Sequence, residues 1–529
     1  FDVLMQIYTS AGWDQREAAQ SILKNNLFGL DIDDRAAQLA YFAVMMKARQ
    51  YDRRLLTRGI QPNIYSIRES NGIQAMTIEY FHKNDPKLKA DIESIVTEMR
   101  DAKEYGSILN ITPVDFAGLY ARFDEIREDI DMMQKPALEE LLPLVKCAEL
   151  LAQKYDVVVT NPPYMGNNSF NVKLSNYVKA NYADVKGDLF AVMMTRAERM
   201  TAQDRYYSMI TQQSWMFLSS YELLRKRINR HIIVNLAHLG SRAFDEISGE
   251  MVSTTVFINR NSSIKLYKGT YSCLVDYQGE ASKERAYLEK ENMYVATQAN
   301  FEKIPGIPVA YWITYGIANA FEKGCSITKY ADTFQGIITG DNDKFLRLWH
   351  EVSASRIPFH AGSMDNVNLS EKYWIPYNKG GEFRKWYGVQ DYVVYWRFGP
   401  DDKTRGKKGF SNYYLREYVA WSYTISNSIA TRYYPQGFLW DVRGSGIMDK
   451  SDMLLYLEGL ISSKIGITLF RVNNSTLSCQ VENIVQLPII SSTMYKETVD
   501  ILVNENNQLS QSDWDSYETS WDFKRNPLV

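Results

Sequence analysis

The feature of this sequence that most constrains its fold is a run of three valines, followed shortly by an asparagine, two prolines and a tyrosine. Val157–Val159 are β-branched and apolar, which is typical of a buried strand. Because proline donates no hydrogen bond to a β-ladder, we expect this strand to end at Pro162. In open α/β sheets, ligands bind just beyond the carboxyl ends of the strands. The sequence therefore predicts an α/β fold with a site at Asn161, Pro162, Pro163 and Tyr164.

The residue types at this predicted site fit the activation of an amine. The exocyclic NH2 of a purine is a poor nucleophile, since its lone pair is delocalised into the ring. The Asn161 side-chain carbonyl and the Pro162 backbone carbonyl can both accept hydrogen bonds from such an NH2, which frees the lone pair to attack a methyl group. This chemistry rests on positioning and fixed dipoles and needs no metal. Tyr164 can stack on a base that has left the duplex. A strand followed by a proline turn, with Asn161 as a turn former, is the alternative.

Length and composition bound the possible classes. The 529 residues are enough for two or three domains, and 45% hydrophobic with 23% charged residues is ordinary for a globular protein. With a net charge of −3, any contact with DNA must come from local basic patches. The four cysteines form no Cys-x-x-Cys pair and the five histidines have no metal-ligand spacing, which predicts a reducing cytoplasm and no metal site. We find no signal peptide and no apolar run long enough to span a membrane.

A second candidate site lies near the start of the chain. Residues 26–31 read as a short strand that ends in Asp31, and Asp33 and Asp34 suit the N-cap of the helix that follows. The apolar face of that helix is predicted to comprise Ala36, Leu39, Ala40, Ala43 and Met46. A carboxylate at the end of the second strand of a Rossmann-like sheet can hold both ribose hydroxyls of a nucleoside cofactor. Asp31 fits that role better than the two capping residues do.

Residues 1–300 are predicted to form the first domain. We expect a polar insertion around 56–105, a sheet strand at 105–110 and an amphipathic helix at 134–155 that leads into the valine strand. Residues 165–186 are rich in Asn, Gly, Ser and Lys and are predicted to form a mobile loop over the site.

Residues 301–529 differ in texture, with short predicted strands, many glycines and aromatic residues mixed with basic ones. The candidates for DNA contact form one basic loop: Lys403, Arg405, Lys407 and Lys408. Aromatic side chains follow closely: Tyr413, Tyr414, Tyr418, Trp421, Tyr423, Tyr433 and Tyr434, with Arg432 among them. Such a pattern suits phosphate contacts and base stacking. A solvated loop over an aromatic core is the alternative.

The tetrapeptide Asn161–Tyr164 resembles motif IV of adenine-N6 DNA methyltransferases, although similar tetrapeptides occur in enzymes that methylate glutamine or the N2 of guanine. The resemblance implies a Rossmann-like class I methyltransferase domain that transfers a methyl group from S-adenosylmethionine to a flipped adenine. Asp31 then matches motif II, the ribose ligand. The Gly-rich motif I, which holds the methionine part of the cofactor, has no match in the sequence. We expect it immediately upstream of Phe1, where the chain begins as a helix already under way.

Phe244 fits the motif VIII aromatic of the similar γ-class enzymes, which stacks on the flipped base opposite the motif IV tyrosine. The alternative is a core phenylalanine at the edge of a loop. The polar residues around Phe244 (Arg242, Asp245 and Glu246) favour partial exposure of its ring.

Taken as a whole, the chain resembles the PglX methyltransferases of BREX phage-defence systems. The segments that carry this resemblance are Leu27–Ala40, Val157–Gly166, Gln212–Leu224, Ala243–Ile258, Gln335–Leu348 and Thr431–Gly446. It implies that residues 1–300 are the methyltransferase domain and that residues 301–529 are a mixed α/β target-recognition domain, as in single-chain restriction-modification enzymes. It also implies double-stranded DNA and other proteins of the defence system as partners, and a methyl mark that separates self from phage DNA.

Two other functions are compatible with the sequence. In the first, the chain is a non-catalytic DNA-recognition subunit of a defence complex, which cofactor binding by the intact protein would exclude. In the second, the amine chemistry is kept but the substrate is RNA or a protein glutamine. The large second domain argues against the second alternative, because small substrates do not need such a reader.

Overall fold

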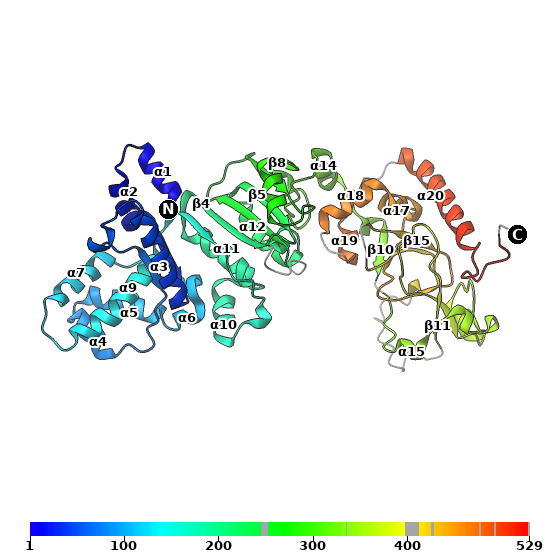
Figure 1. Ribbon diagram of the computed structural model, residues 1–529. Coiled ribbons are helices and arrows are strands. Elements are labelled where there is room, and N and C mark those ends of the chain that lie inside the picture. The colour runs from blue at the N-terminus through cyan, green and yellow to red at the C-terminus, as the bar shows by residue number, and fades with distance from the viewer. Residues whose placement is uncertain are drawn as a thin grey trace. The chain divides into compact units, whose positions relative to one another are not determined.

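The computed structural model divides into two compact units (Figure 1). It describes residues 1–244, 252–334, 336–396, 412–424, 428–474, 478–490 and 493–526. The first unit comprises 1–215 and 220–296, and the second comprises 216–219 and 297–529. Among the helices of the described ranges, none is long and apolar enough to cross a membrane.

The first unit is built on a six-stranded mixed sheet with the order β3-β4-β6-β5-β7-β8. The strands are β3 (Tyr155–Thr160), β4 (Thr201–Gln212), β5 (Ile232–Gly240), β6 (Thr254–Arg260), β7 (Lys268–Cys273) and β8 (Met293–Thr297). β3 pairs with β4 in parallel, whereas β6 runs antiparallel to both β4 and β5. β3, β4 and β5 therefore run in the same direction, and their carboxyl ends lie at one edge of the sheet.

A separate pair of parallel strands, β1 (Phe28–Asp31) and β2 (Asn63–Ser66), precedes this sheet in sequence. β2 lies inside the predicted polar insertion at 56–105, so that segment contributes a sheet strand as well as helices. The prediction of a strand at 105–110 is wrong, because the chain there ends α6 (Ala102–Tyr105) and makes a 3-10 turn over Gly106–Ile108. The ring of Tyr105 stacks on the ring of Tyr177, and the backbone of a helical turn allows this contact.

Helices surround these strands in the first unit. They are α1 (Asp2–Ser10), α2 (Gln15–Ser21), α3 (Asp34–Arg49), α4 (Ala75–His82), α5 (Pro86–Glu98), α7 (Phe116–Arg127), α8 (Gln134–Pro136), α9 (Leu142–Ala152), α10 (Val172–Asn181), α11 (Leu189–Met200), α12 (Glu222–Ile228) and α13 (Glu280–Leu288). The helix predicted at 134–155 is confirmed as α8 and α9, joined by a π-helical turn over Ala137–Leu141. The loop predicted at 165–186 is largely helical instead, because Asn171 caps α10 by accepting from the Leu174 N–H.

Two predicted apolar surfaces of the first unit are exposed. Val157 and Val159 on β3 are 57% and 71% exposed, so the prediction of a buried strand is wrong for this face. The reason is that β3 is the end strand of its sheet and pairs only with β4 among the described strands. On α3, the face predicted to be apolar is also exposed, and Leu39 is 69% exposed. The buried side chains of α3 are Ala37, Met45 and Ala48, which lie on its other side.

The second unit contains two four-stranded sheets, ordered β10-β17-β14-β15 and β11-β13-β12-β16, and a short pair, β9-β18. Its strands are β9 (Cys325–Ser326), β10 (Ala331–Phe334), β11 (Leu346–Leu348), β12 (Trp374–Asn378), β13 (Tyr392–Tyr395), β14 (Tyr418–Trp421), β15 (Thr431–Tyr434), β16 (Leu439–Trp440), β17 (Gly446–Asp449) and β18 (Pro488–Ile489). Its helices are α14 (Tyr315–Lys323), α15 (Asn342–Phe345), α16 (Met364–Leu369), α17 (Leu454–Ser462), α18 (Lys464–Asn473), α19 (Val481–Val485) and α20 (Thr493–Trp514). Most of its short strands are edged by turns, as the glycine-rich sequence suggests.

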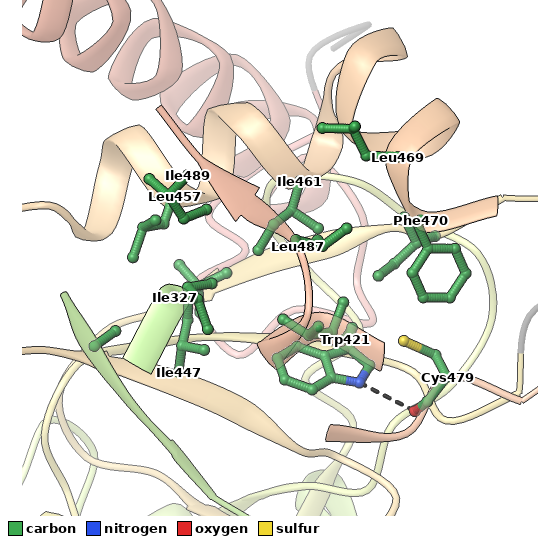
Figure 2. Packing of buried hydrophobic residues seen from close by; sticks show 14 of the residues in the cluster. Ile327, Trp421, Ile447, Leu457, Ile461, Leu469, Phe470, Cys479, Leu487 and Ile489 are labelled. Carbon is green, nitrogen blue, oxygen red and sulfur yellow. Dashed lines mark hydrogen bonds between the residues drawn. The ribbon is translucent and has the colours of Figure 1, made fainter. Parts of the chain in front are cut away.

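The core of the second unit lies between its first sheet and helices α17 to α19 (Figure 2). Trp421 is fully buried there, and its indole N–H donates to the Cys479 carbonyl at 3.2 Å. Other members of the cluster include Ile327, Ile447, Leu457, Ile461, Leu469, Phe470, Leu487 and Ile489. This continuous apolar cluster joins segments from residue 304 to residue 489 into one core.

Candidate active site at the carboxyl edge of the first sheet

The Asn-Pro-Pro-Tyr motif lies directly after β3, at the edge where parallel strands end. Pro162 is buried, Asn161 and Pro163 are exposed, and Tyr164 is half-buried. A buried proline between two exposed residues fixes the backbone while it leaves the Asn161 side chain accessible. The structure therefore puts the predicted amine acceptors at an open sheet edge, in a stiff segment.

The far end of this segment is joined to the start of α11. Met165, which follows Tyr164, donates its N–H to Asp188 Oδ1 at 3.2 Å and accepts from the Leu189 N–H at 2.9 Å. Gly166 and Asp188 form an antiparallel bridge. Burial raises the pKa of Asp188, while hydrogen bonds from backbone N–H groups partly offset that effect. Asp188 was not predicted as a site residue, because in the sequence it is recognisable only as an acidic residue before an apolar helix.

The ring of Tyr164 rests edge-on against another aromatic side chain. Its centroid is 6.2 Å from that of Phe190, with the two planes at 83°, and Phe190 in turn contacts Tyr221 at 5.6 Å. Burial raises the pKa of Tyr164, so the phenol stays neutral at physiological pH. The half of Tyr164 that is exposed leaves an aromatic surface available for stacking.

A hydrogen-bonded pair, the buried His238 and the partly exposed Gln213, lies at the same edge of the sheet. His238, near the end of β5, lies with Nε2 2.7 Å from Oε1 of Gln213, which follows β4. Burial, with a smaller contribution from Lys283, lowers the pKa of His238 to about 4. The neutral ring therefore donates its Nε2–H to Gln213 and orients the amide at the sheet edge. Nothing in the spacing of these residues predicted the pair, because it depends on the register of β4, β6 and β5.

Phe244 follows β5 and is 42% exposed, in agreement with the expected partial exposure. Two strands lie between β3 and β5, so the Tyr164 and Phe244 segments start about 14 Å apart at the common edge, from the ordinary strand spacing. Within the described residues no ring contact joins Tyr164 and Phe244. Lys283 braces the start of the Phe244 segment, since it is 3% exposed and donates to the Leu239 and Leu274 carbonyls at 2.6 and 2.8 Å.

Asp31 is the last residue of β1, and its side chain is exposed. Its Oδ1 accepts from the Asp33 N–H at 2.8 Å, which turns the carboxylate at the strand end. Asp33 caps α3 as predicted, and Asp34 forms ion pairs with Lys103 and Arg68. Of the three acids, Asp31 alone stands at the strand end without a capping role or an ion pair among the described residues.

A cavity of about 150 Å³ is lined by both β1 and β3. Its lining includes Phe28, Gly29 and Leu30 of β1, Tyr155 and Val157–Thr160 of β3, and Met193, Arg196, Ala197 and Met200 of α11. Phe28 and Tyr155, the first residues of their strands, pack edge to face at 5.6 Å. No described strand pairs with the edge of β1 or of β3 that faces this cavity.

The predicted DNA contacts of the second unit are only partly described. Lys403, Arg405, Lys407 and Lys408 lie outside the described residues. Of the residues that follow them in the sequence, Tyr418, Trp421 and Tyr434 are fully buried and Arg432 is 1% exposed, which is typical of an aromatic core. These four side chains pack in the interior and do not offer surfaces for base stacking. Tyr423 is 38% exposed.

Across the described ranges, no group of three or more His, Cys, Asp or Glu side chains could hold a metal ion. The four cysteines are all unpaired, and Cys147 and Cys479 are buried.

The chain is similar in sequence to a known protein family and to two named proteins. Residues 25–244 match the Eco57I restriction-modification methylase family. The chain is 35% identical over 562 residues to adenine-specific methyltransferase PglX of Lacticaseibacillus casei (strain Zhang), which covers all of this chain and 46% of that protein. It is also 35% identical over 564 residues to adenine-specific methyltransferase BrxX of Escherichia coli O9:H4 (strain HS), which covers all of this chain and 45% of that protein. The chain thus spans about half the length of these two relatives.

Among solved structures, the Type IIL restriction-modification enzyme MmeI in complex with DNA resembles this chain with a TM-score of 0.51 and 13% identity. The likeness covers 99% of this chain and 70% of MmeI and concerns the mixed α/β fold. The family match spans β1, α3, β3 and the Asn161–Tyr164 segment in one continuous stretch. Residues 25–244 are thus similar to the Eco57I restriction-modification methylases, in a chain that is similar over its whole length to the PglX and BrxX adenine-specific methyltransferases.

Proposed function

We propose that this chain is the catalytic and DNA-reading part of an adenine-N6 DNA methyltransferase. The observation that carries the proposal is the accessible Asn161 at the carboxyl end of β3, which is followed by the buried Pro162 and by Met165, whose N–H donates to Asp188. The names of the PglX and BrxX relatives support adenine as the methylated base. In such a system, the methyl mark would label self DNA for a phage-defence complex of the BREX type.

Each residue at the sheet edge has its own role in the proposed reaction. Asn161 Oδ1 and the Pro162 carbonyl accept the two N–H bonds of the adenine amine and direct its lone pair away from the ring. Tyr164, supported by Phe190, stacks on one face of the extruded base, and Phe244 closes on the other. Fixed dipoles of this kind act without a proton-transfer group at the start of the reaction.

S-adenosylmethionine would supply the electrophilic methyl group when bound. The exposed carboxylate of Asp31, at the end of a parallel strand, fits the two ribose hydroxyls of such a cofactor. One hydrogen bond, from the Asp33 N–H to Oδ1, orients the Asp31 carboxylate. Its other oxygen is left for a second partner.

The fold that we propose for the methylase domain is Rossmann-like, with one further parallel strand between β1 and β3. The support comes from the cavity that both strands line and from their unpaired edges within the described chain. A strand in this place would cover Val159 and join the two sheets in the order β2-β1-strand-β3-β4. A glycine-rich turn after that strand would lie beside both Asp31 and Asn161. None of the strands in the described ranges occupies this place.

The second unit is proposed to recognise the DNA sequence. Basic residues at 403–408, which precede the buried Tyr418 and Trp421 in the sequence, would contact phosphates and place the unit for reading of base edges in the major groove. Other proteins of the defence system would be further partners, and we expect the full-length protein to act in the cytoplasm.

The decisive experiment maps N6-methyladenine in DNA from cells that carry the full-length gene and its neighbours. We expect one short methylated sequence with the natural protein and none with Asn161→Ala. Asn25→Ala, which removes an exposed asparagine elsewhere in the first unit, is the matched control and should leave methylation unchanged. Methylation that persists with Asn161→Ala would exclude the role given to that residue. If the natural protein leaves adenine unmodified, the non-catalytic DNA-recognition subunit becomes the better interpretation.

A further inference from the structure

One carboxylate holds both the segment that follows Tyr164 and the helix on which Tyr164 rests. We infer that Asp188 is a positioning residue for the Asn161–Tyr164 segment, and this inference rests on the proposed methyl transfer. Asp188 does not directly follow a strand of the sheet. It precedes α11, and its role arises because the chain returns at this point to the Asn161–Tyr164 segment.

The contacts of Asp188 are divided between two parts of the chain. Its Oδ1 accepts from the Met165 N–H and from the Phe190 N–H, both at 3.2 Å. The backbone around it adds the bond from the Leu189 N–H to the Met165 carbonyl at 2.9 Å and the bond from the Asn167 N–H to the Gly187 carbonyl at 3.1 Å. A single oxygen therefore links the catalytic segment to the first turn of α11.

The same oxygen fixes the support of the stacking ring. Phe190, which donates to Asp188, is the side chain that Tyr164 meets edge-on. Displacing the Asp188 side chain would release Met165, the neighbour of Tyr164, and would loosen the turn that carries Phe190. Both changes would move the Tyr164 ring relative to Asn161.

The choice of aspartate at this position is not explained by helix capping alone. Serine caps helices as well as aspartate does, without the cost of a buried charge. Asp188 is 8% exposed and forms no ion pair in the described part of the chain. A serine hydroxyl, one covalent bond shorter, would reach the Phe190 N–H but would fall short of Met165. The carboxylate therefore adds the contact with Met165 in the catalytic segment.

Three substitutions in the full-length protein separate the two contacts. Asp188→Asn keeps an acceptor oxygen in the same place, Asp188→Ser keeps only the helix cap, and Asp188→Ala removes both. Asp85→Ser is the matched control, because Asp85 caps α5 through the Lys87 and Leu88 N–H groups and is exposed. Each variant is compared by methylation kinetics, by thermal unfolding and by hydrogen exchange of the peptide that contains residues 161–170.

We expect Asp188→Ser and Asp188→Ala to lower kcat by about 10- to 100-fold, the cost of a small misplacement of catalytic groups. KM for DNA and for the cofactor should stay within about 3-fold, since Asp188 is buried and its Oδ1 accepts from two backbone N–H groups. Asp188→Asn should keep kcat within about 3-fold, and Asp85→Ser should change neither constant. Exchange of the Met165 amide should accelerate in the Ser and Ala variants and stay slow in the Asn variant.

The inference is overturned if Asp188→Ser keeps natural kcat, or if exchange at 161–170 does not change. It is equally overturned if kcat falls only in proportion to lost thermal stability, with KM rising in parallel, because that result describes a structural role. Should the natural protein show no methylation at all, the proposed function fails on its own. Hydrogen exchange then still decides whether Asp188 holds the Asn161–Tyr164 segment.

Discussion

Strands β3 and β14 have similar apolar sequences but very different surroundings. All four residues of β14 are fully buried, whereas Val157 and Val159 of β3 are more than half exposed. β14 lies between β17 and β15, and its side chains alternate between two apolar clusters. Val419 and Trp421 join the large core of the second unit, and Tyr418 and Ala420 join a smaller aromatic one.

The difference shows what an apolar strand can and cannot indicate about burial. The period and the β-branched residues specify a strand in both cases, but burial depends on which strands and helices cover its edges and faces. In the second unit, these neighbours come from the same chain. In the first unit, one edge of β3 pairs with no strand of the described residues, and this edge lies next to the segment that carries the proposed chemistry.

The largest expected effect is on β14, the fully buried strand of this comparison. Trp421→Ala removes a fully buried indole and its hydrogen bond to the Cys479 carbonyl, and it should destabilise the second unit by about 3–5 kcal/mol. Urea unfolding followed by fluorescence measures this loss. Tyr423→Ala, two residues along the chain and partly exposed, is the control and should cost less than about 1 kcal/mol. Equal losses in both variants would mean that β14 is not a core strand.

A smaller effect tests a buried carboxyl group in the second unit. Glu458 of α17 is fully buried, and its only hydrogen bond in the described chain comes from the Asn507 side chain of α20 at 2.9 Å. Burial raises the pKa of Glu458 to about 8, although the bond from Asn507 acts in the opposite direction. A pKa raised in the folded state means that stability is complete below the unfolded pKa, near 4.5, and is lost as pH rises towards 8.

We therefore expect the second unit to lose roughly 2–3 kcal/mol between pH 5 and pH 8, at about 1.4 kcal/mol for each pKa unit and after allowance for local relaxation. Glu458→Gln should remove this slope and be more stable than the natural protein at pH 8. Unfolding at a series of pH values measures both curves. A natural protein whose stability is flat over this range would show that Glu458 is ionised or hydrated in the folded state.

Much of the local structure of both units was predictable from the sequence. The strand around Val157–Val159, the helix predicted at 134–155, which ends at Ala152, and the cap of α3 by Asp33 follow from residue type, proline placement and capping residues. The Asn161–Tyr164 segment was found because proline ends a strand and the motif stands directly after it. These features depend on neighbours in sequence, which the sequence displays openly.

The other site features depend on contacts between distant residues. Asp188 meets Met165 across 23 positions, and His238 meets Gln213 across 25, through the register of three strands. The exposure of Leu39 and Val159 was not predictable either, because an apolar pattern is the same whether or not its partner is present in the chain. The strand predicted at 105–110 failed because aromatic and β-branched residues also suit a helical turn under a packed ring.

The smallest expected effect is on β3, the partly exposed strand of this comparison. Val159→Thr exchanges a methyl group for a hydroxyl at a side chain that is 71% exposed, and in these 529 residues it should change stability by less than about 0.5 kcal/mol. Val419→Thr makes the same exchange at a fully buried position of β14 and should cost about 1–3 kcal/mol, because the hydroxyl is buried without a partner.

The comparison becomes sharper in the full-length protein. If an additional strand fills the cavity between β1 and β3, Val159 is buried there and Val159→Thr should become as costly as Val419→Thr. Unfolding of both variants in the short and the full-length chain gives the four values needed. A Val159→Thr cost that stays near zero in the full-length protein would mean that no strand covers this face. A high cost already in the short chain, and one that varies with protein concentration, would mean that a second copy covers it instead.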